Sequence, residues 1–439
     1  MRSLKIVFVL AGLASLLASP AFGQQTLDFP LGAPQPFHLD SGTLQNTSAS
    51  PSTLFAERVE MPGAAWMRLY FGDVVLGPGS FIRVTSELDG DVQELDADAL
   101  EMWSGTTAYF NGDALTVELV AGPGARRNRL VIDQLAFEAG AAIPAGSCGI
   151  CGADDRVASE EEWSGRILPA GCSASIWNAD SCVVSAGHCI SGGMVMQFNV
   201  PNSNGNCSLN HPPSSEQFPI TSFLFNNGGV GNDWAVMTAG TNSLGETPVE
   251  RYQVFRPLAT SGPANGNPLQ IWGFGIDNEC TKSQTQQTST GSVTSVSGLF
   301  FNHNTDATFG NSGSGILRNG EILGIVTHCP CPNWATRIDH PSFVAARENL
   351  CPVSAEPLDV LLDSVSVVIG DNEAGDIDDI ASVDGSFFSA DALVQGNRHT
   401  ALIEVTATSP QSTASNLELI VTVDQADDNP IFLSTALFN

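Results

Sequence analysis

The chain has 439 residues, with 47 acidic and 17 basic side chains and a formal net charge of -30 at pH 7. This length exceeds what one hydrophobic core holds, so we expect two or three domains. The excess of acid argues against a nucleic-acid partner, because phosphate binding needs clustered lysine and arginine, and it is typical of a soluble protein in an exposed or saline environment.

Residues 1–23 are predicted to be a signal peptide. Arg2 and Lys5 form a charged start, residues 6–17 form an apolar stretch too short to span a bilayer, and Ala21 and Gly23 suggest cleavage after Gly23. No later segment of the sequence has the length and apolarity of a membrane helix. We therefore expect a secreted protein, extracellular or periplasmic, without a membrane partner.

Residues 24–140 contain no cysteine and show short alternating stretches, for example 66–71, 81–85, 115–119 and 130–135. Gly, Pro, Asn and Asp separate these stretches at short intervals. Such a pattern predicts an N-terminal β-sandwich. A linker of small residues follows over 139–146.

Residues 147–354 hold all ten cysteines, at positions 148, 151, 172, 182, 189, 207, 280, 329, 331 and 351. In an exported chain, cysteines are expected to form disulfides. Zinc is the alternative, since Cys148-Gly-Ile-Cys151 and Cys329-Pro-Cys331 resemble ligand pairs. We favour disulfides, and we expect neither a metal nor a cofactor.

Residues 355–439 again lack cysteine and are strongly acidic. The stretches 401–406 and 417–423 alternate at period two, which predicts a small C-terminal β domain. The acidic run 370–379 lacks the spacing of a defined calcium loop, so we interpret it as a solvated turn.

Three segments carry chemistry, and in chain order they give His188, Asp233 and Ser312. A serine hydroxyl is a weak nucleophile that needs a base, and a histidine oriented by a carboxylate supplies one. The string Gly310–Gly315 also fits the nucleophile elbow of an α/β hydrolase. That fold requires a helix after the serine and the order Ser, acid, His, whereas here an Asn319-Gly320 hairpin turn follows.

The region 147–354 resembles a trypsin/chymotrypsin-fold serine endopeptidase. Four segments carry the resemblance: Ser185–Cys189, Asp233–Val236, Asp306–Gly315 and Ile322–Thr327. It is most similar to the bacterial branch that contains the glutamyl and lysyl endopeptidases. The resemblance implies an all-β chain in which a chymotrypsin-like double β-barrel lies between the two flanking β domains.

The resemblance also implies roles. Ser312 attacks the scissile carbonyl, His188 is the base, Asp233 orients His188, and the backbone N–H groups of Gly310 and Ser312 form the oxyanion hole. Thr327 stands where the family places a hydroxyl near the catalytic aspartate.

Cysteine pairing is implied by the resemblance as well. Cys172 precedes Cys189 at nearly the family distance, so a Cys172–Cys189 disulfide is implied. By analogy with the lysyl endopeptidases, Cys148 or Cys151 pairs with Cys351, and the other one pairs with Cys207.

Activation departs from the animal branch of the family, in which a new N-terminus pairs with an aspartate just before the nucleophile. That position is Asn311, and no Ile-Val-Gly-Gly start occurs. The cleavage-like sequence Arg166–Pro169 lies too close to Cys172 to serve. We therefore predict no activating amine–carboxylate salt bridge. Residues 24–140 are either a removable pro-region or a permanently attached accessory domain.

The specificity pocket is the least determined feature. In the trypsin branch, an aspartate at the place of Asp306 selects basic residues, which favours a basic preference here. Glutamyl endopeptidases carry a histidine on the pocket strand, but Val326 holds that place, with His328 two residues later. Glutamyl specificity is therefore the alternative. His303 could approach the pocket, although we expect it at the surface.

The sequence thus predicts a secreted serine endopeptidase that acts on protein or peptide substrates. The alternative from another class is a secreted binding or adhesion protein whose protease-like domain is inactive.

Overall fold

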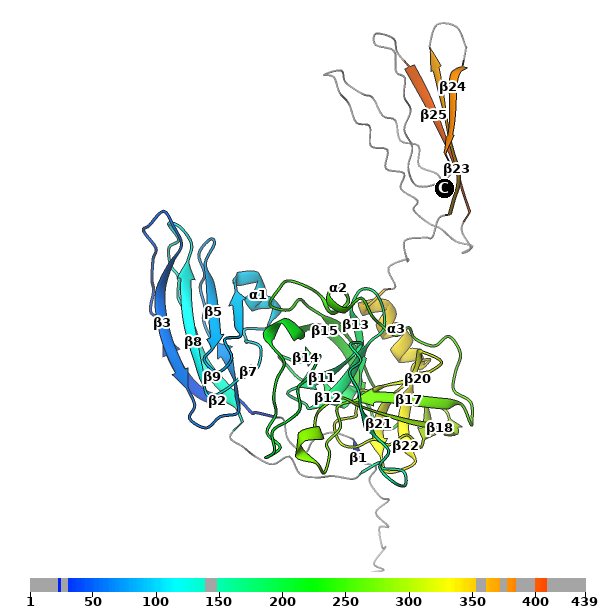
Figure 1. Cartoon of the computed structure of the whole chain (residues 1–439), viewed down its shortest axis with the longest axis horizontal. Helices are drawn as coiled ribbons and strands as arrows, with labels where there is room; N and C mark the ends of the chain where they lie inside the picture. The colour runs from blue at the N-terminus through cyan, green and yellow to red at the C-terminus, as the bar shows by residue number, and fades with distance from the viewer. Residues whose placement is uncertain are drawn as a thin grey trace, which may run out of the picture. The chain divides into compact units, whose positions relative to one another are not determined.

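The computed structural model describes residues 23–24, 31–138, 148–352, 361–371, 377–383 and 399–408 (Figure 1). The chain divides into two compact units, residues 1–352 and 353–439. Apart from Gly23, the predicted signal peptide lies outside the described residues, as does the linker 139–146.

The first part of the larger unit contains two four-stranded antiparallel sheets. One has the order β2 (Gln35–Asp40), β9 (Val131–Phe137), β4 (Trp66–Phe71) and β7 (Phe110–Asn111). The other has the order β3 (Ser52–Glu60), β8 (Ala114–Ala121), β5 (Phe81–Ser86) and β6 (Val92–Leu95), and α1 (Ala97–Met102) follows β6. Alternate residues of both sheets share one buried cluster, which includes Trp66, Leu69, Ile82, Val84, Leu119 and Leu135.

Next along the chain is a closed antiparallel barrel of six strands. Its order is β11 (Ser164–Leu168), β12 (Cys172–Ile176), β13 (Cys182–Ser185), β16 (Asp233–Ala239), β15 (Gln217–Asn227) and β14 (Val195–Gln197). Almost every residue of β11 to β13 is buried, because both their inner and outer faces are covered.

A second six-stranded barrel follows. Its order is β21 (Glu321–Cys329), β20 (Gly315–Arg318), β17 (Pro268–Gly273), β18 (Gln287–Ser297), β19 (Phe300–His303) and β22 (Asn333–Arg337), and β22 pairs back with β21. Two short strands lie at its edges: β10 (Val157–Ala158) pairs with β18, and β1 (Gly23–Gln24) pairs with β21. The predicted double-barrel architecture is confirmed.

Helices are few and short among the described residues: α1, α2 (Pro248–Tyr252) and α3 (Pro341–Leu350), with three single 3-10 turns. None of these helices is long and apolar enough to cross a membrane.

The smaller unit is described as a three-stranded antiparallel sheet in the order β24 (Ile377–Val383), β23 (Leu361–Asp371) and β25 (His399–Thr408). Much of the acidic run 370–379 lies outside the described residues.

The sandwich is bonded to the first barrel by reciprocal hydrogen bonds. The Asn111 side chain accepts from the His211 backbone N–H and donates to the His211 carbonyl, both at 2.8 Å. The Gln217 side chain makes the same pair of bonds to the Tyr109 backbone, at 2.9 and 2.8 Å. Apolar residues from the protease-like region also belong to the sandwich core: Leu168, Val195, Leu209 and Ile276. The interface therefore combines buried apolar contacts with paired hydrogen bonds between side-chain amides and backbone groups.

All ten cysteines form disulfides: Cys148–Cys329, Cys151–Cys331, Cys172–Cys189, Cys182–Cys351 and Cys207–Cys280. The zinc alternative is wrong, because the sulfurs of its two ligand pairs are joined to each other. The pairings taken from the lysyl endopeptidases are also wrong, because Cys351 pairs with Cys182 and Cys207 pairs with Cys280. The Cys182–Cys351 disulfide joins β13 to the end of α3.

Candidate active site

His188 and Asp233 meet at the end of the first barrel. His188 lies in the turn Gly187–Cys189 directly after β13, and Asp233 begins β16, the neighbour of β13. The two carboxylate oxygens of Asp233 contact different atoms of His188. Oδ2 lies 2.5 Å from Nδ1 of the ring, and Oδ1 accepts the backbone N–H at 3.0 Å. Asp233 is fully buried, and only 2% of the His188 side chain is exposed. The ring is therefore fixed in both position and tautomer, with Nε2 left to receive a proton.

Ser312 lies in the loop before β20 and is fully buried. Its Oγ donates to the carbonyl of Thr327 at 3.4 Å, while Nε2 of His188 makes no hydrogen bond within the described structure. The structure thus joins His188 to Asp233 but does not form the Ser312–His188 bond. Catalytic hydrogen bonds are commonly long or unmade when no substrate is bound.

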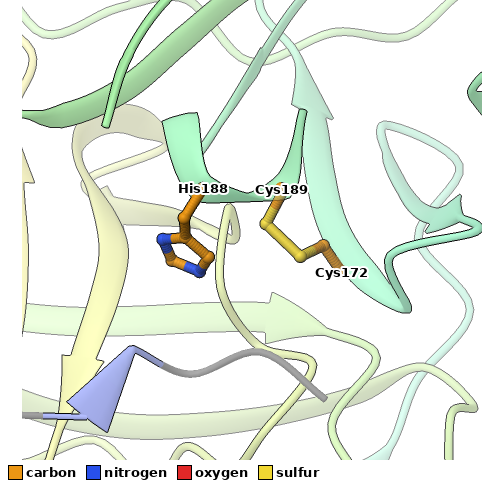
Figure 2. A group of neighbouring side chains, drawn as sticks. All are labelled: Cys172, His188 and Cys189. Carbon is orange, nitrogen blue, oxygen red and sulfur yellow. A yellow bond between two sulfur atoms is a disulfide. The ribbon is translucent and has the colours of Figure 1, made fainter. Parts of the chain in front are cut away.

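A disulfide lies directly beside His188 (Figure 2). Cys172 of β12 is joined to Cys189, with an S–S distance of 2.07 Å. The sulfurs and the imidazole are close enough together to resemble a metal site. Because both sulfurs are consumed by the disulfide, their role is to tie the His188 turn to the first barrel.

The loop before Ser312 is held by hydrogen bonds to the Ile276 backbone and to the side chain of Asn311. Gly310 has a φ of +98°, which favours glycine, and the carbonyl of Phe309 accepts the Ile276 N–H at 2.8 Å. In a trans peptide the C=O and N–H point in opposite directions, so the Gly310 N–H points away from Ile276. Asn311 is buried, and its Oδ1 accepts the Thr308 N–H at 2.8 Å. An amide is thus accommodated where the animal branch uses a charged aspartate.

A residue that the sequence reasoning did not single out lies behind this loop. The Arg156 side chain is only 4% exposed, and its Nη1 donates to the Ile276 carbonyl at 3.0 Å and to Oγ1 of Thr308 at 3.1 Å. Nη2 lies 2.7 Å from the Asp154 carboxylate and 3.3 Å from that of Asp277. No local motif could reveal these contacts, because Arg156 meets Thr308 across 152 residues of chain.

Two side chains of β21, those of Thr327 and His328, were predicted to belong to the site. The Thr327 hydroxyl donates to the Trp334 carbonyl at 3.3 Å, and Nδ1 of His328 lies 3.9 Å from Oδ2 of Asp233. The register between β21 and β22 shifts between Val326 and His328, which changes the direction of successive side chains. Burial lowers the pKa of His328, so its imidazole stays neutral beside His188.

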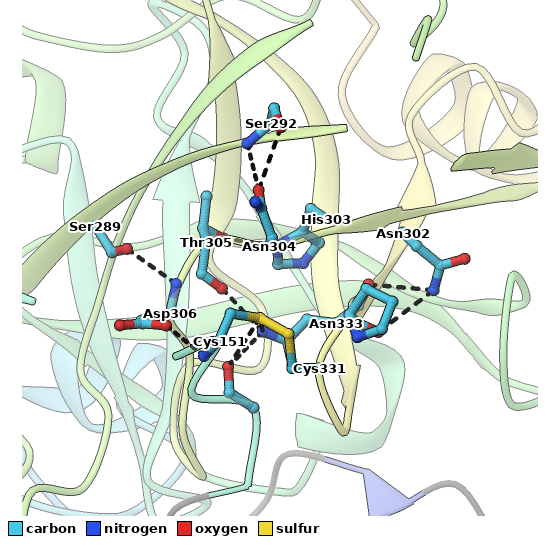
Figure 3. The surroundings of a disulfide bond; sticks show 12 residues. Cys151, Ser289, Ser292, Asn302, His303, Asn304, Thr305, Asp306, Cys331 and Asn333 are labelled. Carbon is cyan, nitrogen blue, oxygen red and sulfur yellow. Dashed lines mark hydrogen bonds between the residues drawn. A yellow bond between two sulfur atoms is a disulfide. The ribbon is translucent and has the colours of Figure 1, made fainter. Parts of the chain in front are cut away.

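Asp306 is buried among backbone donors rather than in contact with the triad (Figure 3). One carboxylate oxygen accepts the Cys151 N–H at 2.6 Å, and the other accepts the Asp155 N–H at 2.9 Å. Burial raises the pKa of Asp306. The Asp306 carboxylate therefore ties the segment after Cys151, which the Cys151–Cys331 disulfide also holds, to the loop that precedes Ser312.

His303 is fully buried, so the expectation that it lies at the surface is wrong. β19 carries it between β18 and β22, inside the second barrel. Its Nδ1 lies 2.6 Å from Oγ1 of Thr305, and burial lowers the pKa of His303 to about 3. The imidazole is therefore neutral and carries no charge to bind an acidic side chain.

The edge of β21 beyond Thr327 pairs with an extended segment of the same chain. In β1, Gly23 lies opposite Cys329 and Gln24 lies opposite His328, in the antiparallel direction. The backbone of β1 thus runs along β21 toward Thr327, whose carbonyl accepts the Ser312 hydroxyl.

Comparison with known proteins adds three findings. The trypsin family model matches residues 150–342, which is less than half of the chain. No curated protein matches the sequence. A solved structure of a Glu endopeptidase in complex with MPD is similar at 18% identity and a TM-score of 0.36, covering 46% of this chain and 98% of its own.

Proposed function

Because residues 150–342 form a trypsin-family serine endopeptidase domain, we propose that the chain hydrolyses peptide bonds with Ser312, His188 and Asp233. The observation that supports these roles is that the Asp233 carboxylate contacts both the ring Nδ1 and the backbone N–H of His188. Ser312 is also buried, and its backbone carbonyl lies 3.8 Å from the sulfur of Cys189, the residue after His188.

Each half of the reaction, acylation and then deacylation, proceeds through two proton transfers at Nε2 of His188. As Ser312 Oγ bonds to the scissile carbonyl carbon, its proton passes to Nε2, and Asp233 stabilises the imidazolium through Nδ1–H. Nε2 then protonates the leaving amine, the C–N bond breaks, and an acyl-enzyme remains. Water repeats the sequence and releases the acid. The N–H groups of Gly310 and Ser312 stabilise the oxyanion, a contribution on the order of 100-fold or more in rate per donor.

The substrate backbone binds along the edge of β21. The antiparallel pairing of β1 with His328 and Cys329 supports this proposal, because a substrate strand can pair with the same edge in the same way. Main-chain hydrogen bonds of this kind give affinity without selecting side chains. Strand addition here directs the peptide toward Thr327 and hence toward Ser312.

For the residue before the cleaved bond, we propose a preference for basic over acidic side chains. Each carboxylate oxygen can accept two hydrogen bonds, so Asp306 keeps acceptor capacity after bonding Cys151 and Asp155. The buried histidines His303 and His328 are held neutral and offer no cation to a glutamate. Peptides that differ only in Arg, Glu or Phe at this position test the preference, and equal rates for all three would refute it.

We further propose that the N-terminal sandwich is a permanently docked accessory domain. The reciprocal bonds of Asn111 with His211 and of Tyr109 with Gln217 support this assignment, since they join the sandwich to barrel residues in the interior. A specific cleavage site inserted in the linker 139–146 tests it by size-exclusion chromatography after cutting. Co-elution of both pieces with retained activity is expected, whereas release of the sandwich would identify a pro-region.

Export is proposed from the cysteines. Five disulfides form and persist in oxidising compartments, which fits the signal peptide predicted at residues 1–23. Mass spectrometry of the protein from the culture medium, with Gln24 as its first residue, is the expected result.

A serine-directed fluorophosphonate tests the enzyme assignment against an inactive binding protein. Labelling of the folded protein is expected at Ser312 and is lost in Ser312→Ala. Ser314→Ala is the matched control, because Ser314 is also buried and stands two residues later in the same loop. Failure to label the folded wild-type protein would favour the binding function.

A further inference from the structure

Ile276 links the buried guanidinium of Arg156 to the nucleophile loop. Its carbonyl accepts from Arg156 Nη1 at 3.0 Å and from Thr308 Oγ1 at 2.8 Å, while its N–H donates to the Phe309 carbonyl at 2.8 Å. The Ile276 backbone is therefore held on both of its polar groups. Its position determines the direction of the Phe309–Gly310 peptide, and with it the Gly310 N–H.

Thr308 makes the second connection. Its hydroxyl receives Arg156 Nη1 at 3.1 Å, and its backbone N–H donates to Asn311 Oδ1 at 2.8 Å. Asn311 directly precedes Ser312. Nη1 of Arg156 thus contacts both Ile276, which bonds to Phe309, and Thr308, which bonds to Asn311. These two residues hold the two ends of the segment from Phe309 to Asn311.

The side chains of Arg156, Thr308 and Asn311 pack closely against the backbone of Gly275. A Cβ on Gly275 would lie 2.2 Å from Asn311 Oδ1, 2.3 Å from Thr308 Oγ1 and 3.1 Å from Arg156 Nη1. The charge of the guanidinium is balanced by Asp154 and Asp277, and its hydrogen bonds are stronger for being charge-assisted.

We propose that Arg156 is a positioning residue that holds the oxyanion-hole peptide and Asn311 in the catalytic arrangement. This inference rests on the proposed function. In place of an N-terminus released by cleavage, the chain uses an internal cation that is present from folding onward. The domain is therefore competent without a cut near residue 156.

The test separates transition-state binding from substrate binding. Arg156→Met removes the charge and the donors but keeps much of the side-chain length. We expect kcat to fall about 10- to 100-fold with KM nearly unchanged, because an oxyanion donor acts mainly on the developing charge. The inhibition constant of a peptide aldehyde, whose carbonyl adds Ser312 Oγ, rises by the same factor. That of the matched peptide with a reduced CH2–NH bond stays constant.

Three further variants keep the test decisive. Arg156→Lys should have a kcat between those of Arg156→Met and the wild type, because a lysine keeps the positive charge but lacks the planar guanidinium with its several donors. Arg318→Met is the control, because Arg318 bonds Ser261 and Gly262 instead of the loop, and it should leave both inhibition constants unchanged. If Arg156→Met does not fold, Thr308→Val removes the hydroxyl that Arg156 contacts, and the same ratio is expected.

An unchanged kcat and aldehyde affinity in the folded variants would overturn the inference and leave the proposed function intact. An equal loss of affinity for both inhibitors would also overturn it, because that result indicates general loosening of the site. Absence of turnover in the wild-type enzyme would instead overturn the proposed function.

Discussion

Gly313, directly after the proposed nucleophile Ser312, is a position where a single methyl group should strongly disturb catalysis. Its φ is +88°, and a Cβ there would lie 2.0 Å from the Ser173 carbonyl oxygen and 2.2 Å from Ser185 Oγ. Gly320, in the turn between β20 and β21, has a nearly identical φ of +86° and open space around it. The pair separates backbone strain from steric displacement of the loop.

The expected magnitudes follow from this comparison. Gly320→Ala carries only the left-handed strain of about 1–2 kcal/mol, a fall of about 2–8 °C in Tm for a domain of this size. Gly313→Ala carries the same strain, and its Cβ must also retreat by about 1 Å from the Ser173 backbone. A displacement of that size at reacting groups costs about 100-fold in rate.

The assay is kcat on a peptide amide for both variants, with Tm from circular dichroism to establish the folded fraction. We expect wild-type kcat in Gly320→Ala and about 1% of it in folded Gly313→Ala. Wild-type kcat in Gly313→Ala would mean that the loop is not clamped against β12, and the reasoning would be refuted.

Three other perturbations bear on the triad, the pocket and the substrate edge. Asp233→Asn should lower kcat about 10,000-fold with little change in KM, because the amide favours the wrong tautomer of His188; a loss below tenfold would remove Asp233 from the mechanism. Burial raises the pKa of Asp306 above its ordinary value of 3.8, so the carboxylate is protonated, and loses its charge, at a pH above 3.8. As the pH falls through that range, the ratio of the rate on Arg peptides to the rate on Phe peptides should decrease. A ratio that stays constant down to pH 3.8 would contradict the pocket proposal. A chain that still carries Gly23 and Gln24, such as the uncleaved precursor, should have a higher KM for extended peptides than a chain that begins at Leu27, with the same kcat, because β1 competes for β21; equal KM values would show that the edge is not shared.

The double barrel could be expected because the family resemblance that implies it rests on local signals. The alternation of strands, the Asn319-Gly320 turn and the short motifs around His188 and Ser312 each depend on a few consecutive residues. The same holds for Asn311, whose lack of charge can be read directly from the sequence and which Thr308 satisfies within three residues.

What could not be predicted depends on contacts between distant segments. The partner of Cys351 and the contacts of Arg156 are set by how the barrels close, which no short pattern encodes. His303 was misplaced because a polar residue in a polar stretch favours the surface, whereas β19 pairs on both sides and Thr305 satisfies one ring nitrogen. The approach of His328 to Asp233 could not be predicted either, because the β21–β22 register shifts between Val326 and His328.

Covalent catalysis by Ser312 is tested most directly by rapid-mixing kinetics on an activated ester. We predict a burst of one equivalent of leaving group per folded molecule, which persists in Ser314→Ala and disappears in Ser312→Ala and His188→Ala. A burst that survives in Ser312→Ala, or its absence from the folded wild-type protein, would contradict the assignment of Ser312 as the nucleophile.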